Sequence, residues 1–459
     1  MSINAKLEKA VKSVERCGAD FSDIYFETSS SHSLAYEDSR FEEISSSISE
    51  GVGARVVKGD ETSLFHAPGM DLSTGIFCLG QAAGNCGIPC SLDQAGDIRI
   101  MEREPSLTPP DTSFFHHVDT RIRNASIWVR QVAMNLETCL RAFTVLNTQG
   151  VLAGDRRIHT VFSVEVVVEK GKLLQTGYEC SAFALGSGDF FRKVSPLETA
   201  GKALARALLM LDAPECPSGP MDVLLAGEAG GTMIHEACGH GLEADIVQKD
   251  YSVYRGKIGQ RVASPLVTMV DDGTLPGFLG SGGCDDEGTP CRRNVLIHEG
   301  VLQGYMNDVT TSVRDASPLS GNGRRSSYRA IPQPRMTNTF VEPGTSSTGD
   351  MLRKISKGLL VKKMGGGEVD PTSGDFVFHV TEGYLVKDGK ILHPVRGAIL
   401  TGNGPEVLMN IEAVGNELCF QPGICGKSGQ NVPVTDGQPS LLIRNLVVGG
   451  SGDSDGPVR

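Results

Sequence analysis

A short glycine-rich segment holds the residues best suited to metal chemistry. His235, Glu236 and His240 fall within six residues, in the run Thr232-Met233-Ile234-His235-Glu236-Ala237-Cys238-Gly239-His240-Gly241. Imidazole is a common zinc ligand, and a nearby carboxylate can take the proton from metal-bound water during hydrolysis. The segment therefore predicts a hydrolytic metal site in which both histidines bind the ion and Glu236 acts as the general base.

The spacing of these histidines differs from the common His-Glu-x-x-His arrangement, in which the two ligands lie four residues apart on one helix face. Five residues of a regular α-helix rotate the second side chain by about 140° from the first, away from a shared metal. Gly239 and Gly241 lower the cost of a local distortion. We therefore expect a π-bulge or a helix end near Gly239.

Two histidines leave a metal short of protein ligands, so a third ligand is needed from a cysteine or acid elsewhere in this half of the chain. Cys425 is the best candidate, because the small residues of Gly423-Ile424-Cys425-Gly426-Lys427-Ser428-Gly429-Gln430 would let its thiolate approach a metal. Glu243 and Asp245 could orient the histidines, and solvated acids or helix caps explain them equally well. Cys238 is better explained as a small apolar side chain.

Composition excludes several classes of protein. The 459 residues carry a formal charge of -12, which disfavours sequence-independent binding to nucleic acid. No stretch approaches the roughly 18 apolar residues of a membrane span, and the polar segment 1–11 lacks the features of a signal peptide. The 12 cysteines are scattered, as free thiols in a reducing compartment would be. We expect a cytoplasmic protein that binds neither membrane nor nucleic acid.

A segment rich in proline and glycine, residues 212–220, is the best candidate for a linker. Placing the main boundary there predicts an N-terminal α/β domain over residues 1–215, with a possible division into subdomains near 85–120. A C-terminal domain that carries the predicted metal site would follow over 216–448. The Gly/Ser/Asp-rich residues 449–459 are expected to form a disordered tail.

Hydrophobic periodicity predicts the main elements. Helices are expected over 3–17, 71–83, 120–142 and 196–211, and strands over 23–28, 33–36, 51–57, 157–168 and 172–178. Beyond the linker, short apolar runs alternate with turns such as Asp272-Gly273, which is typical of antiparallel strands. The fold class expected is α+β, with a largely antiparallel β C-terminal domain that carries the metal-binding helix.

The histidine motif is the first of several distinctive segments that follow one another through the C-terminal half. They are His235–Asp245, Asp285–Pro290, Gly321–Arg325, Arg335–Thr339, Gly365–Asp370, Cys425–Gln430 and Gly437–Pro439. In type and order they resemble the TldD/PmbA family of peptidases, and most closely its TldD branch. The N-terminal half resembles that family only loosely.

This resemblance implies one zinc ion per chain, held by His235, His240 and Cys425, with Glu236 as the base. Because the inactive paralogous branch lacks the motif, the chain resembles the metal-bearing subunit. The resemblance also implies a dimer, either of two identical chains or with that non-metal paralogue. Such dimers enclose a cavity that admits extended or unfolded peptides, so a peptide is the expected substrate.

Two other functions stay open from the residues themselves. Cys425 could be the nucleophile of a metal-free thiol hydrolase with a histidine as base. Alternatively, a structural zinc could stabilise a non-catalytic module that binds unfolded chains. Arg324, Arg325 and Arg335 could grip a peptide carboxylate, because a guanidinium binds carboxylates in a two-pronged arrangement, and structural salt bridges explain them as well.

Overall fold

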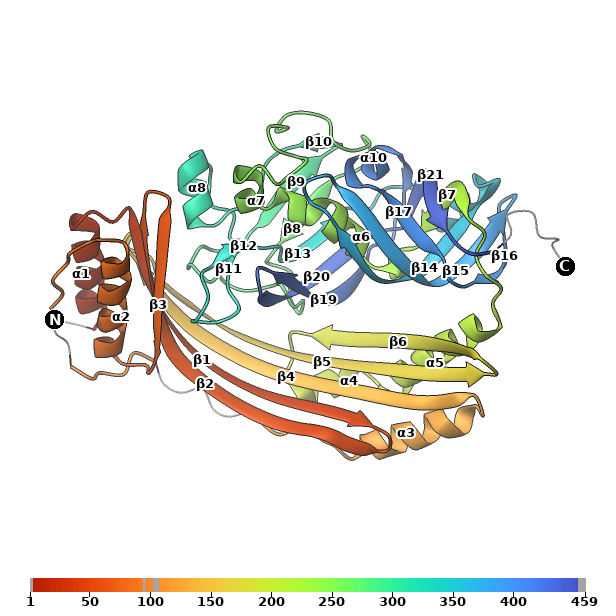
Figure 1. Ribbon diagram of the computed structural model, residues 1–459, viewed down its shortest axis with the longest axis horizontal. Coiled ribbons are helices and arrows are strands. Elements are labelled where there is room, and N and C mark those ends of the chain that lie inside the picture. The colour runs from red at the N-terminus through yellow and green to blue at the C-terminus, as the bar shows by residue number, and fades with distance from the viewer. Residues whose placement is uncertain (1–2, 94–95, 102–106, 453–459) are drawn as a thin grey trace.

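The computed structural model describes residues 3–93, 96–101 and 107–452. Its N-terminal half is a long, curved antiparallel sheet of six strands in the order β3-β2-β1-β4-β5-β6, with helices gathered at both ends (Figure 1). The C-terminal half lies along the concave side of this sheet (Figure 1). The predicted α+β fold class is confirmed.

The N-terminal elements follow the chain in a simple order. The strands are β1 Phe21–Glu37, β2 Arg40–Lys58, β3 Glu61–Pro68, β4 Val129–Asn147, β5 Leu152–Lys170 and β6 Leu173–Phe183. The helices are α1 Ile3–Arg16, α2 Leu72–Asn85, α3 Phe114–Ala125, α4 Ser187–Lys193 and α5 Pro196–Asp212. Three predicted helices, now α1, α2 and α5, are confirmed, and so is the hairpin that turns at Lys170-Gly171.

The helix predicted over residues 120–142 is wrong. α3 ends at Ala125, and residues from Val129 onward form the long strand β4. Val132, Met134 and Leu136 are buried and the residues between them are not, which is the period of a strand. Val132 and Leu136 lie four residues apart, so their spacing alone suits a helix equally well. Pairing with β1 and β5 decides between the two.

The strands predicted over 23–28 and 33–36 are one strand, β1. The serine-rich residues between them pair without interruption with β2 on one side and β4 on the other. Serine has weak strand propensity, but neighbouring strands on both sides supply its backbone hydrogen bonds. Long strands of this kind build the curved sheet.

The C-terminal half contains two larger sheets and a two-stranded sheet of β11 Gly323–Arg324 and β12 Gln333–Pro334. The first sheet has the order β10-β9-β8-β13-β20-β19, from β8 Met269–Asp272, β9 Arg293–His298, β10 Val301–Leu302, β13 Asn338–Val341, β19 Cys419–Lys427 and β20 Gln430–Gln438. The second comprises β7 Gly219–Leu225, β14 Lys357–Val369, β15 Asp375–Lys387, β16 Lys390–Val395, β17 Ile399–Asn403, β18 Ile411–Val414 and β21 Leu441–Gly449. Helices α7 Ala244–Gln248, α8 Val309–Asp315, α9 Thr348–Arg353 and α10 Gly404–Met409 connect them.

Most C-terminal pairings are antiparallel, with β7–β14 and β13–β20 as parallel exceptions. Because β14 pairs with β15 as well as with β7, the order β14-β7-β21-β17-β15 closes on itself. Residues 213–218 connect α5 to β7 between the two halves, and the domain division placed there stays an interpretation. Of the predicted tail, residues 449–452 are described and residues 453–459 lie outside the described residues. Residues 94–95 and 102–106, which fall in the expected subdomain division, also lie outside them.

A buried ionic network joins the two halves. Asp286 binds two arginines of the N-terminal sheet, with Oδ1 2.9 Å from Arg157 Nη1 and Oδ2 3.5 Å from Arg141 Nη2. Next to it, Glu287 Oε1 lies 2.7 Å from Arg55 Nη2, which also binds Asp23. Removing one partner from such a buried pair leaves an uncompensated charge. The segment Asp285–Pro290 therefore fixes the position of the two halves relative to each other.

None of the described helices combines the length and the apolar character that crossing a bilayer requires.

We expect the contribution of Asp286 to stability to depend on pH. Burial would raise the pKa of its carboxyl, but Arg141 and Arg157 outweigh this and lower that pKa to about 2 from 3.8. A depressed folded-state pKa gives stability that is present above about pH 4 and is lost as the pH falls toward 2. Asp286→Asn should cost about 3 kcal/mol at pH 7. Urea unfolding should show this difference narrowing below pH 4, and a difference that stays constant would contradict the expectation.

Candidate metal centre

The two histidines lie on one short distorted helix. After β7, the chain passes through a 3₁₀ turn (η1, Gly227–Ala229) into α6 (Thr232–Ile234), a π-helical segment (η2, His235–Gly239) and a second 3₁₀ turn (η3, His240–Leu242). The predicted π-bulge near Gly239 is confirmed. The backbone N–H of His240 donates to the carbonyl of His235, the i to i+5 bond of a π turn. This wider turn brings both imidazoles to one face.

Close packing explains the glycine inside the π turn. A Cβ atom at Gly239 would lie 2.1 Å from the sulfur of buried Met336, too close for any larger residue without displacement. Met233 and Ile234 are buried in the same core as Val432 and Val434 of β20. The helix is therefore fixed against the β19–β20 hairpin.

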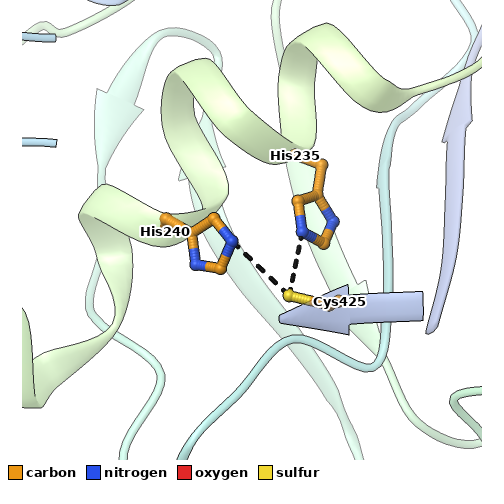
Figure 2. Close-up of side chains that lie close together, drawn as sticks. All are labelled: His235, His240 and Cys425. Carbon is orange, nitrogen blue, oxygen red and sulfur yellow. Dashed lines mark hydrogen bonds between the residues drawn. The ribbon is translucent and has the colours of Figure 1, made fainter. Parts of the chain in front are cut away.

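Cys425 approaches the histidines from this hairpin, on the edge strand β19 (Figure 2). Its Sγ lies 3.2 Å from His235 Nε2 and 3.4 Å from His240 Nε2. The two rings are nearly perpendicular, with their centroids 5.0 Å apart. Three residue positions separated by up to 190 residues in the chain thus present their donor atoms within 4.8 Å of one another.

These donors fit a small metal ion such as zinc. At ordinary bond lengths, a nitrogen and a sulfur on a tetrahedral zinc lie about 3.5 Å apart, close to the two separations found here. Imidazole and thiolate together favour zinc over magnesium or calcium. A zinc ion held by these three donors would have a fourth tetrahedral position open, as in catalytic rather than structural zinc sites.

A carboxylate orients each imidazole from behind. His235 Nδ1 donates to Asp436 Oδ1 at 2.7 Å, and His240 Nδ1 donates to Glu243 Oε2 at 3.0 Å. Since each Nδ1 carries the donated proton, the Nε2 atom of each ring faces Cys425 and, when deprotonated, can bind a metal. Glu243 thus takes the orienting position that the sequence suggested as one possibility.

Two buried cations tie the cysteine strand to this arrangement. Lys427 Nζ lies 3.0 Å from Glu243 Oε2 and 2.6 Å from Asp245 Oδ1. Arg335 donates through Nη2 to the Cys425 carbonyl at 2.7 Å. The strand that carries the thiol and the turn that carries His240 are therefore held by one set of hydrogen bonds.

The surroundings of Cys425 stabilise its thiolate form. Burial would raise the pKa of the Cys425 thiol, but hydrogen bonds from His235 and His240 outweigh it and lower that pKa to about 5. Burial would lower the pKa of His240, but Glu243 and Cys425 raise it to about 9. The anionic sulfur and the two carboxylate-supported rings thus favour positive charge between them.

Glu236 is the most exposed of the four predicted site residues. Its side chain is 26% exposed, whereas those of His235 and His240 are 4% and 12% exposed. Its Oε2 lies 3.9 Å from His240 Nε2, the ring nitrogen that faces Cys425. Burial is the main cause that raises the pKa of the Glu236 carboxyl above its ordinary value. A carboxylate so placed can exchange protons with a molecule bound beside the histidines.

Sequence reasoning did not find Asp436. No spacing rule relates this aspartate to His235, which lies 201 residues earlier.

The three arginines that the sequence offered as substrate-binding groups differ in their surroundings. Arg325 and Arg335 are fully buried with internal partners, so they cannot grip a substrate, whereas Arg324 lines a cavity.

Comparison with known proteins identifies the chain. Residues 22–74 match PmbA/TldA metallopeptidase domain 1, residues 106–211 match the central domain, and residues 218–450 match the C-terminal domain. The chain belongs to the PmbA/TldD metallopeptidase family. Membership confirms the predicted resemblance and the expected enzyme class, a metallopeptidase.

Relatives of this PmbA/TldD chain match most of its length or about half of it. The metalloprotease TldD homolog of Haemophilus influenzae is 38% identical over 449 residues, covering 94% of this chain and 93% of that relative. The zinc metalloprotease TldD homolog of Saccharolobus solfataricus is 33% identical over 237 residues, about half of each chain (51% and 52%). The structure of TldE from Thermococcus kodakarensis has the same fold, with a TM-score of 0.75 at 18% identity over 97% of this chain and all of that one.

The geometry predicts that metal content depends on His235 from the helix and on Cys425 from the hairpin. We expect about one zinc per chain in the parent protein, and less than about a tenth of that in His235→Ala and Cys425→Ser. Elemental mass spectrometry on dialysed proteins measures this, with the exposed Glu417→Gln as a control that keeps its metal. Equal metal in the parent and in both ligand variants would rule out this cluster as the binding site.

Asp436 should strengthen metal binding without touching the ion. Asp436→Ala removes the acceptor for His235 Nδ1 and should weaken zinc affinity about 10- to 100-fold. Competition with a chromophoric chelator measures the dissociation constant, and circular dichroism checks the fold. Asp436→Asn, which keeps an acceptor oxygen, should lose less, and unchanged affinity in both variants would refute an orienting role.

Proposed function

We propose that this metallopeptidase hydrolyses peptide bonds in extended or unfolded peptides, with one zinc ion held by His235, His240 and Cys425. The convergence of these three donors beside a partly exposed carboxylate is the observation that carries the proposal. A relative described as a zinc metalloprotease supports the identity of the metal. When bound, zinc would polarise the scissile carbonyl and make a water molecule more acidic.

Glu236 is the general base in this proposal. Its carboxylate takes a proton from the attacking water and later delivers a proton to the leaving amine. The raised pKa of Glu236 brings its basicity closer to neutral pH, where proton transfer in both directions is most effective. Asp436 and Glu243 keep the rings in one orientation during the cycle, so only Glu236 needs to change protonation state.

Burial of the site favours an extended substrate. His235 and Cys425 are each about 95% buried, with exposed fractions of 4% and 5%. A loop of a folded protein brings its neighbours with it and would collide with the surrounding sheets, whereas a single extended strand is narrow. We therefore propose that peptides without stable structure are the substrates.

The alternative of a metal-free thiol hydrolase receives less support. The lowered pKa of Cys425 would suit a nucleophile, but its sulfur is buried and faces two imidazole nitrogens rather than open space. Both rings are also held by carboxylates in the orientation that metal ligands need. Family membership likewise favours the enzyme over a non-catalytic binding module. Chelator-resistant hydrolysis that a thiol alkylator abolishes would reverse this preference.

The assembly and location of the protein are further proposals. We propose a cytoplasmic dimer, formed with a second copy or with a paralogue that lacks the metal motif. The shared fold of the Thermococcus kodakarensis TldE supports the idea that a related chain could occupy the equivalent place. Size-exclusion chromatography with light scattering would distinguish a dimer of this chain from a monomer that awaits another partner.

Replacing Glu236 should separate metal binding from catalysis. Glu236→Gln keeps the size and the hydrogen-bonding capacity of the side chain but removes its basicity, so kcat should fall by about 10²- to 10⁴-fold. Zinc content should stay that of the parent. Hydrolysis of an unstructured fluorogenic peptide and elemental mass spectrometry measure both, with exposed Glu228→Gln as the control. Parent-like hydrolysis by Glu236→Gln would exclude the base role.

A further inference from the structure

A cavity of about 620 Å³ lies between the concave face of the N-terminal sheet and the C-terminal half. One wall is formed by β4 and β5, another by residues 274–282, and a third by the tip of the β19–β20 hairpin. Its volume lies within the range of binding sites for small molecules and peptide side chains. The metal centre does not use this space.

The cavity has an apolar wall and a basic end. Ile424 and Phe278 supply apolar surface, and the Ile424 side chain is 54% exposed although its neighbour Cys425 is buried. Arg324, Arg157 and Arg141 line it as well. A ligand that fills it would combine an apolar body with a negatively charged group.

The arginines differ in how their charges are compensated. Arg157 and Arg141 share Asp286 behind the wall, and each has a second carboxylate partner, Asp155 and Glu27 respectively. The third of these arginines, Arg324, is 5% exposed and donates to two neutral acceptors, the carbonyls of Met336 at 2.6 Å and Pro433 at 2.7 Å.

Among the residues that the structure describes, no carboxylate forms an ion pair with Arg324. Burial and the nearby guanidinium of Arg157 lower the pKa of Arg324 to about 10, which is consistent with an excess of positive charge around this side chain. Two carboxylates also line the cavity. Asp155 is paired with Arg157, and Glu137 is exposed, so water screens its charge. An incoming carboxylate would therefore find a buried cation with no competing anion in contact.

The cavity and the metal centre lie on opposite faces of one strand. Successive side chains of a strand point to opposite sides, so Cys425 faces the histidines while Ile424 faces the cavity. β19 is the edge strand of its sheet, with no further strand beyond it, and Cys425 lies two residues before the end of this strand. An extended peptide advances about 3.3 Å per residue, so a few residues suffice to pass from one face to the other.

We propose that this cavity is a remote subsite that binds a carboxylate of the peptide substrate, with Arg324 as its cationic anchor and Ile424 as its apolar wall. This inference rests on the proposed peptidase function and adds a preference for acidic peptides. The carboxylate can come from an acidic side chain or from the C-terminus of the peptide. The guanidinium recognises both in the same way.

Binding to the full-length Glu236→Gln protein tests the subsite without hydrolysis. The probes are short, fluorescent, unstructured peptides with an amidated C-terminus, in which one glutamate moves along the sequence and each is matched by a glutamine peptide. A further glutamine peptide carries a free C-terminal carboxylate. Fluorescence anisotropy should show about tenfold tighter binding for at least one glutamate position or for the free carboxylate. The arm that shows it identifies the source of the carboxylate.

Two further changes in the same protein locate the effect. Arg324→Gln should abolish the preference, but Arg324 also holds two backbone carbonyls. Ile424→Glu avoids that risk, because Ile424 is exposed and pairs across the hairpin with Pro433, whose carbonyl Arg324 binds. The new carboxylate should occupy Arg324 and remove the preference, whereas Ile424→Gln should keep it.

Equal affinity for every glutamate and glutamine pair and for both C-termini would overturn the proposal, as would a preference that persists in Ile424→Glu. Hydrolysis by the parent protein is measured separately. Cleavage without an acidic preference refutes the subsite alone, and an acidic preference without cleavage refutes the peptidase function while the subsite stands.

Discussion

The hydrogen bonds from Asp436 and Glu243 to the two imidazoles are the interactions on which the rest of the centre depends. They determine which nitrogen of each ring is free, and therefore where a cation can bind. The π turn allows both rings to share a face, but it does not set their rotation. Only acceptors placed behind them, one on β20 and one after the helix, do so.

The carboxylates in turn need cations, and the strand that carries Cys425 provides one of them. Lys427 forms ion pairs with Glu243 and Asp245, and Arg335, which follows β12, holds the carbonyl of Cys425. Buried charges are costly unless they are paired, so these groups form one interdependent unit. A displacement of the hairpin would disturb the sulfur and the histidine orientation together.

The same principle operates between the halves of the molecule. Asp286 and Glu287 bind arginines of the N-terminal sheet, which places the concave sheet surface against the C-terminal half. This contact encloses the cavity beside β19, where Arg324 departs from the pattern because its partners are neutral carbonyls. The difference between a compensated and an uncompensated arginine separates a structural contact from a candidate binding group.

The sequence by itself determined the local chemistry. Histidines five residues apart, an adjacent glutamate and small flanking residues were sufficient to predict His235, Glu236 and His240 and the π distortion, because helix geometry relates residues close in the chain. Cys425 stood out through its small neighbours, and the family resemblance made it part of a set. Residues 120–142 were misassigned since Val132 and Leu136 suit both periods. Asp436, the roles of the three arginines and the cavity were decided by tertiary structure alone, because pairing between distant strands follows no spacing rule along the chain.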